Sequence, residues 1–597
     1  MARIRVRSFG GMIPALDSKL LPNENASNAV NCRLVDGKLR PFKKVSNPYN
    51  PPASVNMTRS EIGFDRIENV PFSGAYLSQY PTMFRVLNQN ASKYDSVGYP
   101  FVTHPRIFGV AETVVRGIDF GGGPLRTLGV PSGPRILLKG ITPQLRSKYP
   151  IARRYCATYV NQYGEEGPPG IISQDIYCFE GDTIELLIRP TFNNFPDHFY
   201  ALSKIRLYRT AAPYDNGEQM GNKNDTDFIL VTELDYRYSP VGADDQFIDT
   251  IPTSDIPGDL LLSKEFFHAP QLNAVAMAEL ESGYLAIATN DGAIRISERF
   301  QYHAFPLRNE ITIPQQIASM VAYYDSLFVT CKNGSAYKID IRPDATGITF
   351  DVNPYPDVYS SNEARSLVRS NFGAVFASQR GLVGLNAQQQ VLLTRGLINP
   401  DVWNKQFSPI YGIWASGYYI GLGTPDNRHW LMDVPDDITG QTPFGKLVYL
   451  DQEIIPANPN LVIDPTMFSG IYGKDRVYFF QGGAVLFTWE GLEQPASEVD
   501  AARYIWRSKT FVMPAPTTFA AAKIGFKNKD GSAGPIPLTF KLYGDGVLKY
   551  ERLVYSDKPF RLPHLYKSVN WEFELIGYSD VDEVHIATSM IELSDEA

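Results

Sequence analysis

Carboxylates are the first residues in this sequence that could do chemistry. Five of them gather within about thirty residues: Glu279, Glu281, Asp291, Glu298 and Glu310. Two carboxyls hydrolyse a glycosidic bond when they lie about 5–5.5 Å apart in retaining enzymes, or about 6.5–9.5 Å apart in inverting ones. The sequence does not set these distances, and the Ser-x-Asp-x-Gly box of sialidase propellers is missing. We therefore interpret the five as solvated surface carboxylates.

A second acidic group precedes Ile251 and consists of Asp244, Asp245 and Asp249. Carboxylate oxygens are ligands that Ca²⁺ prefers, so the group predicts either a calcium site or a solvated loop. The other motifs of catalysis are missing, including HExxH, GxSxG and the Walker A loop. The seven histidines are scattered singly, at positions 104, 198, 268, 303, 429, 564 and 585. We expect no catalytic residue, no cofactor and no metal centre, and hence no enzyme.

The four cysteines are Cys32, Cys156, Cys178 and Cys331, and none forms a CxxC pair. Cys156 and Cys178 flank two neighbouring strand-like stretches and could face each other. Isolated thiols of this kind are typical of a protein made in a reducing cytoplasm. We expect all four to be buried and reduced.

Composition removes several classes of protein. The chain has 597 residues with 56 Lys and Arg against 64 Asp and Glu, a formal charge of −8, which has the wrong sign for a generally basic nucleic-acid binder. Tyr and Phe number 34 each, and this aromatic content with many Gly and Pro residues favours strands and turns. Apolar stretches are far shorter than the ~20 residues of a membrane span, and heptads are missing. No secretory signal is expected after Arg3, Arg5 and Arg7.

The elements that would carry any site are β-hairpins. Four stretches of residues 268–500 have the form strand, turn with glycine, strand, and their turns are Asp291-Gly292, Asn333-Gly334, Arg380-Gly381 and Gly482-Gly483. The first three turns are 42 and 47 residues apart, which is the period of a four-stranded propeller blade. The repeat is degenerate and lacks a WD or kelch signature. We expect a degenerate, interrupted β-propeller.

Other segments predict further β-structure. Strand-like stretches at 155–160, 183–188 and 204–209 predict a sandwich, and the alternating stretch 571–576 predicts a strand of a closing domain. Asp36-Gly37 and Asp545-Gly546 predict hairpins, the first with a type I′ turn, whereas 23–30 predicts two helical turns. We expect four segments. Residues 1–133 form an N-terminal segment with hairpins and part of the propeller or platform, and residues 134–262 form a fibronectin-III-like sandwich insert. Residues 263–500 form propeller blades, and residues 501–597 form a closing β-domain. The fold class is all-β.

Three stretches in order resemble one family, the nozzle or tail tubular B-type virion proteins of short-tailed (podovirus-type) bacteriophages. The first is GGMIPALDSKLLPNENASNAVNCRLVDGKLRPF at 10–42. The second spans 155–306, where YCATYVNQYGEEGPPG and KIRLYRT are similar to the family's fibronectin-III-like insert, and residues 363–385 resemble a later blade. The third joins 506–524, 560–577 and 585–593.

The resemblance implies a structural virion protein, made in the host cytoplasm and built into the tail. Family members form a homohexameric tube at the tail tip, below the adaptor protein, with tail fibres or receptor-binding proteins nearby. Phage DNA passes through the channel without specific binding. The family has no catalytic residues to carry over. A net acidic tube would repel DNA and let it slide, although net charge does not locate charge.

Two loops are the expected interface segments. The hairpin at Asp36 and Gly37, and the loop 161–170 with Tyr163, Glu165 and Glu166, are exposed by their pattern. Loops of this kind often contact partners, although plain turns without a partner fit the same pattern. Two other functions stay open: a glycan-binding or glycan-hydrolysing tail component built on a propeller, and a cellular propeller scaffold.

Overall fold

The computed structural model describes most of the chain. The described residues are 2–45, 62–68, 82–88, 99–102, 107–111, 126–144, 151–162, 164–190, 202–210, 227–236, 245–256, 258–261, 268, 274–289, 291–344, 347–361, 363–415, 417–426, 428–435, 438, 446–455, 461–463, 477–481, 485–489, 495, 500–527, 530–531, 534–535 and 537–594. They are almost entirely strands and connecting turns. Two compact units are present: unit 1 comprises 1–95, 315–340 and 351–597, and unit 2 comprises 96–314 and 341–350.

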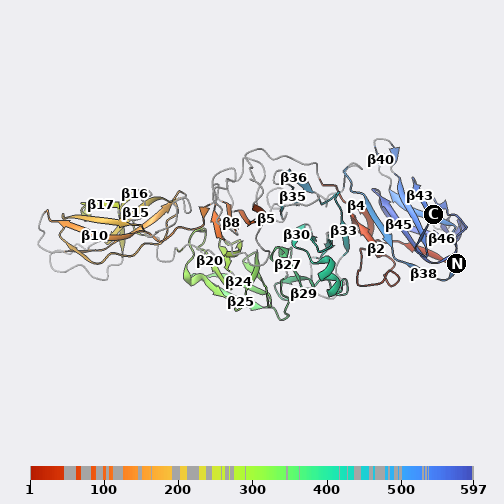
Figure 1. Cartoon of the computed structure of the whole chain (residues 1–597), viewed down its shortest axis with the longest axis horizontal. Coiled ribbons are helices and arrows are strands. Elements are labelled where there is room, and N and C mark those ends of the chain that lie inside the picture. Colours follow the sequence, from red (N-terminus) through yellow and green to blue (C-terminus); the bar gives the residue numbers. More distant parts are fainter. Residues whose placement is uncertain are drawn as a thin grey trace. The chain divides into compact units, whose positions relative to one another are not determined.

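Unit 2 contains a β-sandwich (Figure 1). One sheet has the order β10-β14-β17, the second β12-β15-β16, and a short pair β11-β13 accompanies them. Side chains from both sheets share one core, including Tyr155, Leu186 and Leu207. The bounds are β10 Arg135–Thr142, β11 Ile151–Arg153, β12 Tyr155–Asn161, β13 Ile176–Cys178, β14 Thr183–Arg189, β15 Leu202–Thr210, β16 Phe228–Asp235 and β17 Asp245–Asp249.

The first propeller blade also belongs to unit 2. Four consecutive strands form an antiparallel meander in the order β18-β19-β20-β21. Their bounds are Ala274–Glu279, Leu285–Thr289, Ala293–Ile296 and Glu310–Thr312. Further strands of unit 2 are β7 Tyr99–Val102, β8 Ile107–Ala111 and β9 Arg126–Thr127, with β7 antiparallel to both others. Two 3-10 turns are η2 Thr253–Asp255 and η3 Leu307–Asn309.

Three more meanders of four strands follow, β22-β25, β26-β29 and β30-β33. Phe328 of the first and Phe376 of the second share a core, and Val375 and Trp414 of the second and third share another. The bounds are β22 Ile317–Tyr323, β23 Ser326–Cys331, β24 Tyr337–Asp344, β25 Gly347–Pro354, η4 Ala364–Ser366, β26 Val368–Arg369, β27 Gly373–Ser378, β28 Gly381–Asn386, β29 Gln390–Leu392, α1 Pro400–Val402, η5 Trp403–Phe407, β30 Tyr411–Ala415, β31 Tyr418–Leu422, β32 His429–Asp433 and β33 Leu447–Leu450. The repeated four-stranded meander is the blade of a β-propeller.

Unit 1 has further hairpins. The strands β34 Leu461–Ile463, β35 Val477–Gln481 and β36 Val485–Trp489 form one antiparallel sheet, and β5 Ile62–Glu68 pairs with β6 Thr82–Asn88. The predicted hairpins in residues 268–500 are therefore confirmed at all four turns.

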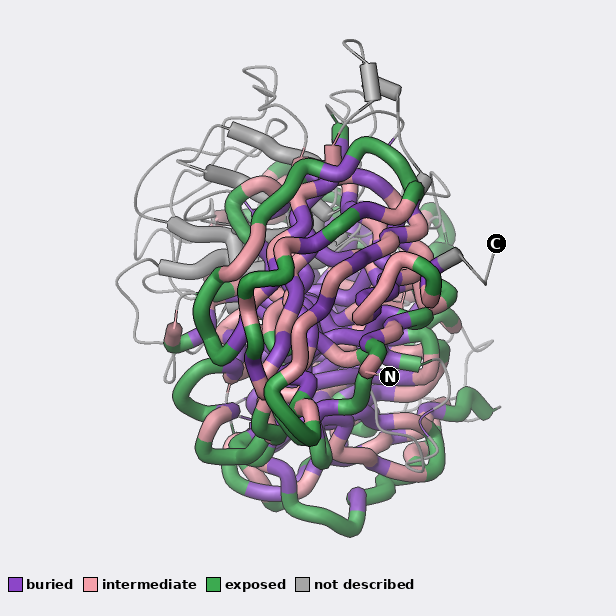
Figure 2. The backbone as a smooth tube through the Cα atoms, turned by 90° about the vertical axis from the view of Figure 1, so that its right-hand side faces the viewer, coloured by how far each residue is buried: buried purple, intermediate pink, exposed green. Residues whose placement is uncertain are grey.

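The two ends of the chain build one C-terminal β-domain in unit 1. Strand β2 lies between β33 and β37, while β1 and β4 both pair with β46. The core holds large side chains from both ends, such as Phe9, Trp506 and Phe573. Figure 2 shows buried backbone in the interior and exposed backbone around it. The bounds are β1 Arg3–Val6, β2 Ala26–Val30, β3 Cys32–Val35, β4 Lys38–Pro41, β37 Tyr504–Ser508, β38 Phe511–Thr517, β39 Ala521–Lys527, β40 Asp530–Gly531, β41 Gly534–Pro535, β42 Leu538–Gly544, β43 Val547–Val554, β44 Phe560–Arg561, β45 Ser568–Gly577, β46 Asp580–Ala587 and α3 Ile591–Ser594.

Two local predictions have opposite outcomes in this domain. The Asp36-Gly37 turn is confirmed, because both residues have positive φ, 53° and 73°, between β3 and β4. The helix expected at 23–30 is wrong. That stretch contains strand β2, because its backbone pairs with β37 and Ala26 and Ala29 enter the core. Tertiary pairing here overrides local periodicity.

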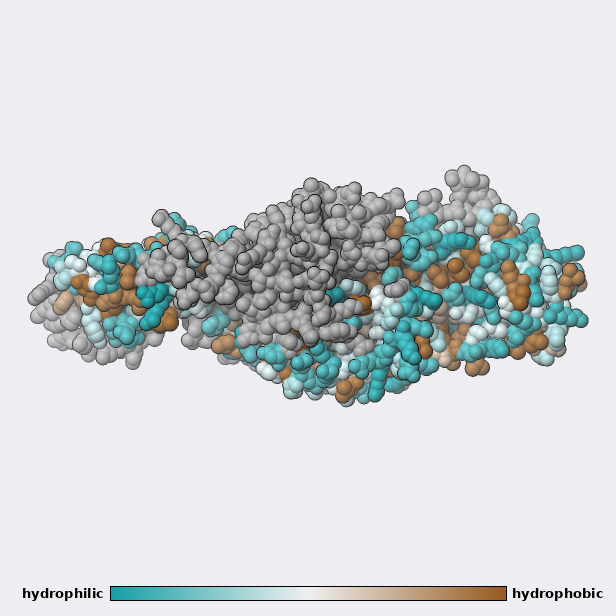
Figure 3. Space-filling model, in the orientation of Figure 1, coloured by the Kyte–Doolittle hydropathy of each residue, from teal (hydrophilic) through white to brown (hydrophobic). Residues whose placement is uncertain are grey.

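The surface of this domain is mixed. On the face that Figure 3 shows, hydrophobic residues lie among hydrophilic ones. None of the helices in the described part of the chain has the length and apolar character needed to cross a bilayer.

Candidate functional site

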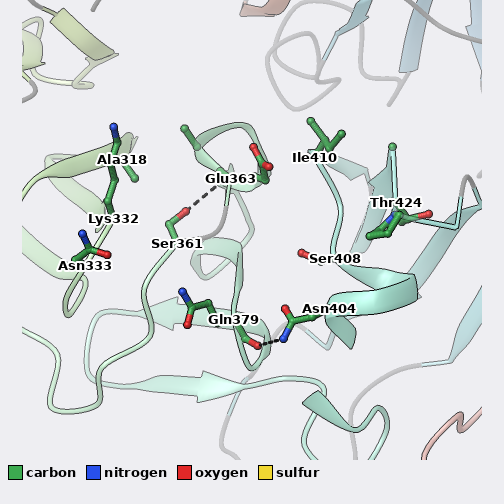
Figure 4. A pocket seen from close by; sticks show the side chains of 13 residues that line it. Ala318, Lys332, Asn333, Ser361, Glu363, Gln379, Asn404, Ser408, Ile410 and Thr424 are labelled. Atoms are coloured by element: carbon green, nitrogen blue, oxygen red, sulfur yellow. Dashed lines mark hydrogen bonds between the residues drawn. The ribbon is translucent and has the colours of Figure 1, made fainter. Parts of the chain in front are cut away.

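The meander of each blade brings particular loops to one end of the sheet. The turn between the second and third strands lies at the end where the fourth strand finishes, and the linker to the next blade starts there. In unit 1 these loops surround a pocket of about 750 Å³ (Figure 4). Its lining residues are Ala318, Lys332, Asn333, Ser361, Glu363, Ala364, Gln379, Asn404, Ser408, Ile410, Gly423, Thr424 and Pro425.

Hydrogen bonds fix the loops around this pocket. The Ser361 amide donates to the carbonyl of Cys331 at 2.9 Å, which ties the linker before β26 to the end of β23. Ser361 Oγ donates to the carbonyl of Glu363 at 3.3 Å, and Asn404 Nδ2 donates to the carbonyl of Gln379 at 2.8 Å (Figure 4). The pocket wall is therefore held by bonds that tie the linkers between blades to the strand ends and turns of the preceding blades.

A buried tryptophan supports the wall from beneath. Trp403 is fully buried, and its Nε1 donates to the carbonyl of Ser378 at 2.8 Å. This bond joins the one-turn π-helix η5 to the β27–β28 turn, directly beside Gln379 and Asn404. Gly423 has a φ of 66°, a left-handed conformation that favours glycine, and it turns β31 back toward β32.

The chemistry of the pocket is that of hydrogen bonding. Amides and hydroxyls line it, with a single ammonium on Lys332 and a single carboxylate on Glu363. No histidine or cysteine is among the residues that line it. Such a set can bind a neutral polar ligand. Sequence reasoning missed these residues, and the signal available was only the Asn333-Gly334 turn and Gln379 just before the next glycine turn.

The first predicted interface residues lie in the C-terminal β-domain. Asp36 is exposed at the tip of the β3–β4 hairpin, and Gly37 is half-buried. The Phe9 amide donates to the carbonyl of Gly37 at 2.8 Å, which holds the turn against the N-terminal strand. Their interface role stays a prediction.

The second predicted segment is not the exposed loop that we expected. Residues after Asn161 run back along β12, and the amides of Gly167, Gly170 and Ser173 donate to β12 carbonyls at 2.9, 2.8 and 2.8 Å. Main-chain pairing therefore draws this loop onto the sandwich. Tyr163 lies outside the described residues.

Both glutamates of this loop are used internally. Glu165 is buried and accepts a bond from Asn161 Nδ2 at 2.7 Å, with His303 Nδ1 at 3.6 Å. Glu166 is half-buried and accepts bonds from Tyr208 at 2.7 Å and Arg206 at 2.8 Å. Charge pairing and hydrogen bonding make their burial tolerable, so the expectation of exposure is wrong for both.

The carboxylates of the first blade are separately engaged. Glu279 accepts a bond from the Tyr302 hydroxyl at 2.8 Å, and burial raises the pKa of its carboxyl, an effect that the Tyr302 bond partly offsets. Other contacts pair Glu298 with Arg308 at 2.9 Å, Glu310 with Arg295 at 2.8 Å, and Asp291 with Thr289. Glu281 is exposed. The interpretation as solvated carboxylates is wrong for Glu279, Glu298 and Glu310, which are half-buried.

The acidic group for which a calcium site and a solvated loop were both open is also reassigned. Asp249 is fully buried on β17, where its Oδ2 accepts bonds from Arg209 and from the Tyr155 hydroxyl, both at 2.6 Å. Asp245 is half-buried on the same strand, and Asp244 lies outside the described residues. The described residues contain no group of three or more His, Cys, Asp and Glu arranged to hold a metal ion. Asp249 therefore serves an ion pair within the sandwich.

The four cysteines are buried and free, as expected. Burial raises the pKa of Cys178 to about 11 and of Cys156 to about 12. These two thiols belong to different clusters, Cys178 in the sandwich core and Cys156 on the outer side of its sheet with Phe228. They do not face each other.

Comparison with known proteins gives no family for the chain. No family model matches it, and no curated protein matches it. Among solved structures it is similar to a chain in the mitotic checkpoint complex, with 9% identity over 60% of this chain and 94% of that one, at a TM-score of 0.23. It is also similar to the Cps50 (Swd1) β-propeller domain of Myceliophteria thermophila, with 9% identity over 39% of this chain and 87% of that one, at a TM-score of 0.22. It is similar as well to BamB from Moraxella catarrhalis, with 11% identity over 40% of this chain and 90% of that one, at a TM-score of 0.20.

Proposed function

We propose that this chain is a structural virion protein, the nozzle of a short phage tail, through which the genome is ejected. One observation carries the proposal: the two terminal stretches that resemble the family lie together in one domain. The stretch 10–42 supplies β2, β3 and β4. Strand β2 pairs with β37, β3 pairs with β4, and β4 pairs with β46. Strands β37 and β46 overlap the pieces 506–524 and 585–593 of the third stretch. Trp506 Nε1 donates to the carbonyl of Gly10 at 3.1 Å. Two of the stretches that resemble the family therefore belong to one folded domain.

The state of the carboxylates favours a structural role over hydrolysis. Glu298 and Glu310 are each neutralised by an arginine, and Glu279 is hydrogen-bonded to a tyrosine. A glycosidase needs two carboxyls that face the same glycosidic oxygen. In the pocket between the blades of unit 1, Glu363 is the one carboxylate among the lining residues.

In this proposal the protein forms a homohexamer below the tail adaptor, near fibre or receptor-binding proteins. Six copies carry −48 in formal charge. Phosphates bind tightly where Lys and Arg neutralise them, so an acidic channel lets DNA slide. The proposed location is the tail of the virion.

A second candidate is a glycan-binding tail component, and the pocket is the observation that favours it. Asn333, Gln379 and Asn404 present amides at its rim, and amides donate and accept hydrogen bonds as sugar hydroxyls require. Substituting Gln379 and Asn404 by Ala would remove oligosaccharide binding if the pocket is the site.

The deciding experiment follows assembly of the purified full-length chain. We expect native mass measurement and negative-stain images to give a six-membered ring with a central hole, either alone or after addition of tail-less particles. The same preparation is then tested for oligosaccharide binding. A monomer that fails to join tail-less particles and binds oligosaccharide through Gln379 and Asn404 would reject the nozzle in favour of the second candidate.

A further inference from the structure

The sandwich encloses a cluster of charged side chains between its sheets. Arg209 is on the inward side of β15, two residues after Leu207 of the core. Arg209 and Asp249 of β17 are fully buried, and Arg153 of β11 is 2% exposed. Arg209 Nη1 lies 2.6 Å from Asp249 Oδ2, and Arg153 Nη1 lies 4.0 Å from the same oxygen. Two guanidinium groups therefore share one buried carboxylate.

One edge of the Arg209 guanidinium has no hydrogen-bond partner. Nη1 donates to Asp249, whereas Nε and Nη2 are buried and bond to none of the residues that the structure describes. Arg153 Nε is a further buried donor in the same condition. Buried N–H groups without acceptors are costly and rare in native proteins. The cluster therefore has donors for at least one more acceptor group.

The second carboxylate of the cluster, Glu180, lies at its border with solvent. Glu180 Oε2 accepts a bond from Arg153 Nη2 at 2.8 Å, and Oε1 accepts one from the Thr253 amide at 2.7 Å. The Glu180 side chain is 29% exposed, so water screens its charge more than it screens the charges of the buried groups. Among the fully enclosed groups, two cations face one anion.

The oxygens of Asp249 are already in use. Oδ2 accepts bonds from Arg209 and from the Tyr155 hydroxyl, and Oδ1 accepts one from the Ile251 amide at 3.0 Å. A water molecule beside Arg209 would need acceptors for its own two hydrogens, because an internal water is held by several polar partners. An acceptor without hydrogens of its own suits an edge that consists only of donors.

We propose that the Nε–Nη2 edge of Arg209 binds a small monovalent anion of the size of chloride. Nε and Nη2 lie side by side on the planar guanidinium, the arrangement that holds carboxylates and phosphates through two parallel bonds. Arg209 has no exposed surface, so the anion is bound inside the folded sandwich and stabilises it. The inference is independent of the proposed function.

The test is the chloride dependence of unfolding of the full-length chain. Urea unfolding is followed by far-UV circular dichroism while chloride replaces gluconate at constant ionic strength. An anion bound only by the folded sandwich raises the ratio of folded to unfolded sandwich about tenfold for each tenfold rise in chloride above the dissociation constant. Tryptophan fluorescence reports on unit 1, which contains all six tryptophans, and its midpoint should not move with chloride.

The decisive variant is Arg209→Lys. Lysine keeps a positive charge for Asp249 and lacks the planar fork, so we expect the chloride dependence of the dichroism transition to be lost. The matched control Arg206→Lys makes the same change three residues earlier on β15, at a half-buried side chain that pairs with Glu166 and Glu233. This control should retain the full chloride dependence.

A direct measurement does not depend on a variant. Crystals of the unmodified chain grown in bromide should give an anomalous scattering peak within hydrogen-bond distance of Arg209 Nε and Nη2. Three results would overturn the proposal. Chloride and gluconate could give the same dichroism transition, Arg209→Lys could retain the chloride dependence, or the bromide crystals could show water at this edge.

Discussion

At the scale of the residue, the ion pair of Arg209 and Asp249 joins the two sheets of the sandwich. Both side chains are fully buried, and their atoms lie 2.6 Å apart. Arg153 NH1 lies 4.0 Å from the same carboxylate, and Tyr155 donates its hydroxyl to it. The carboxylate therefore compensates charge that has no access to water, and the sandwich depends on its presence.

We expect Asp249→Ala to destabilise unit 2 by about 3–5 kcal/mol, because it leaves buried arginine charge uncompensated. The double variant Arg209→Leu, Asp249→Leu should cost less than the single one, since it removes both charges. Urea unfolding followed by far-UV circular dichroism measures both. Equal losses in the two variants would show that packing rather than charge determines the effect.

Glu279 gives a pH dependence whose sign is set by burial. Burial raises the pKa of its carboxyl in the folded state, although the bond from Tyr302 opposes this. The folded state then holds its proton more tightly than the unfolded state, so this group stabilises the fold at low pH. That contribution is lost as the pH rises through the folded-state pKa.

Glu279→Gln should remove this slope, because an amide keeps a hydrogen bond from Tyr302 and does not ionise. We expect the stability of the variant relative to the unmodified chain to increase between pH 4 and pH 7. Thermal unfolding at a series of pH values measures this difference, with the exposed Glu281→Gln as the control. A parallel pair of curves for Glu279→Gln and the unmodified chain would contradict it.

At the scale of the element, two Asp-Gly hairpins differ only in their surroundings. The turn residues Gly37 and Gly546 have φ angles of 73° and 79°, and each preceding Asp is also left-handed. A Cβ on Gly37 would meet Ser8 Oγ at 2.9 Å, whereas a Cβ on Gly546 would meet no atom within 4 Å. The same turn is therefore packed at one site and open at the other.

Gly546→Ala should cost about 1–2 kcal/mol, the price of a left-handed alanine. Gly37→Ala should cost more because of the contact with Ser8. The double variant Ser8→Ala, Gly37→Ala should recover most of the difference. Both turns belong to unit 1, so tryptophan fluorescence during urea unfolding measures all three variants. Equal costs at the two glycines would show that Ser8 moves aside freely.

At the scale of the whole molecule, the tryptophans are all in one unit. The six are Trp403, Trp414, Trp430, Trp489, Trp506 and Trp571, and every one is buried in unit 1. Unit 2 has a core of its own, which contains tyrosines and aliphatic residues such as Tyr155 and Leu207. Tryptophan fluorescence therefore reports on unit 1 alone, while circular dichroism reports on both.

We expect unfolding followed by the two signals to give transitions that do not coincide. Asp249→Ala should shift the dichroism curve and leave the fluorescence midpoint unchanged. Two-state unfolding of the entire chain would instead give coincident curves that move together in this variant. The comparison requires no separate fragment.

The sequence alone determined the class of fold and its hairpins. Turn chemistry at Asp36-Gly37 and Asp545-Gly546, and the spacing of the blade turns, are local properties, because a left-handed turn restricts which residues can occupy it. The buried, free state of the cysteines followed from their type and isolation. The function as a nozzle protein, and the partners that the resemblance implies, stay predictions.

Only the tertiary structure decided which distant segments meet. The stretch 23–30 has helical periodicity, yet it forms β2 because β37 offers backbone partners nearly five hundred residues away. Glu165, Glu166 and Asp249 have the pattern of solvated loops, yet they are buried or half-buried. Arginine and hydroxyl donors reach Glu166 and Asp249 from other strands, and Glu165 is bonded to the Asn161 amide.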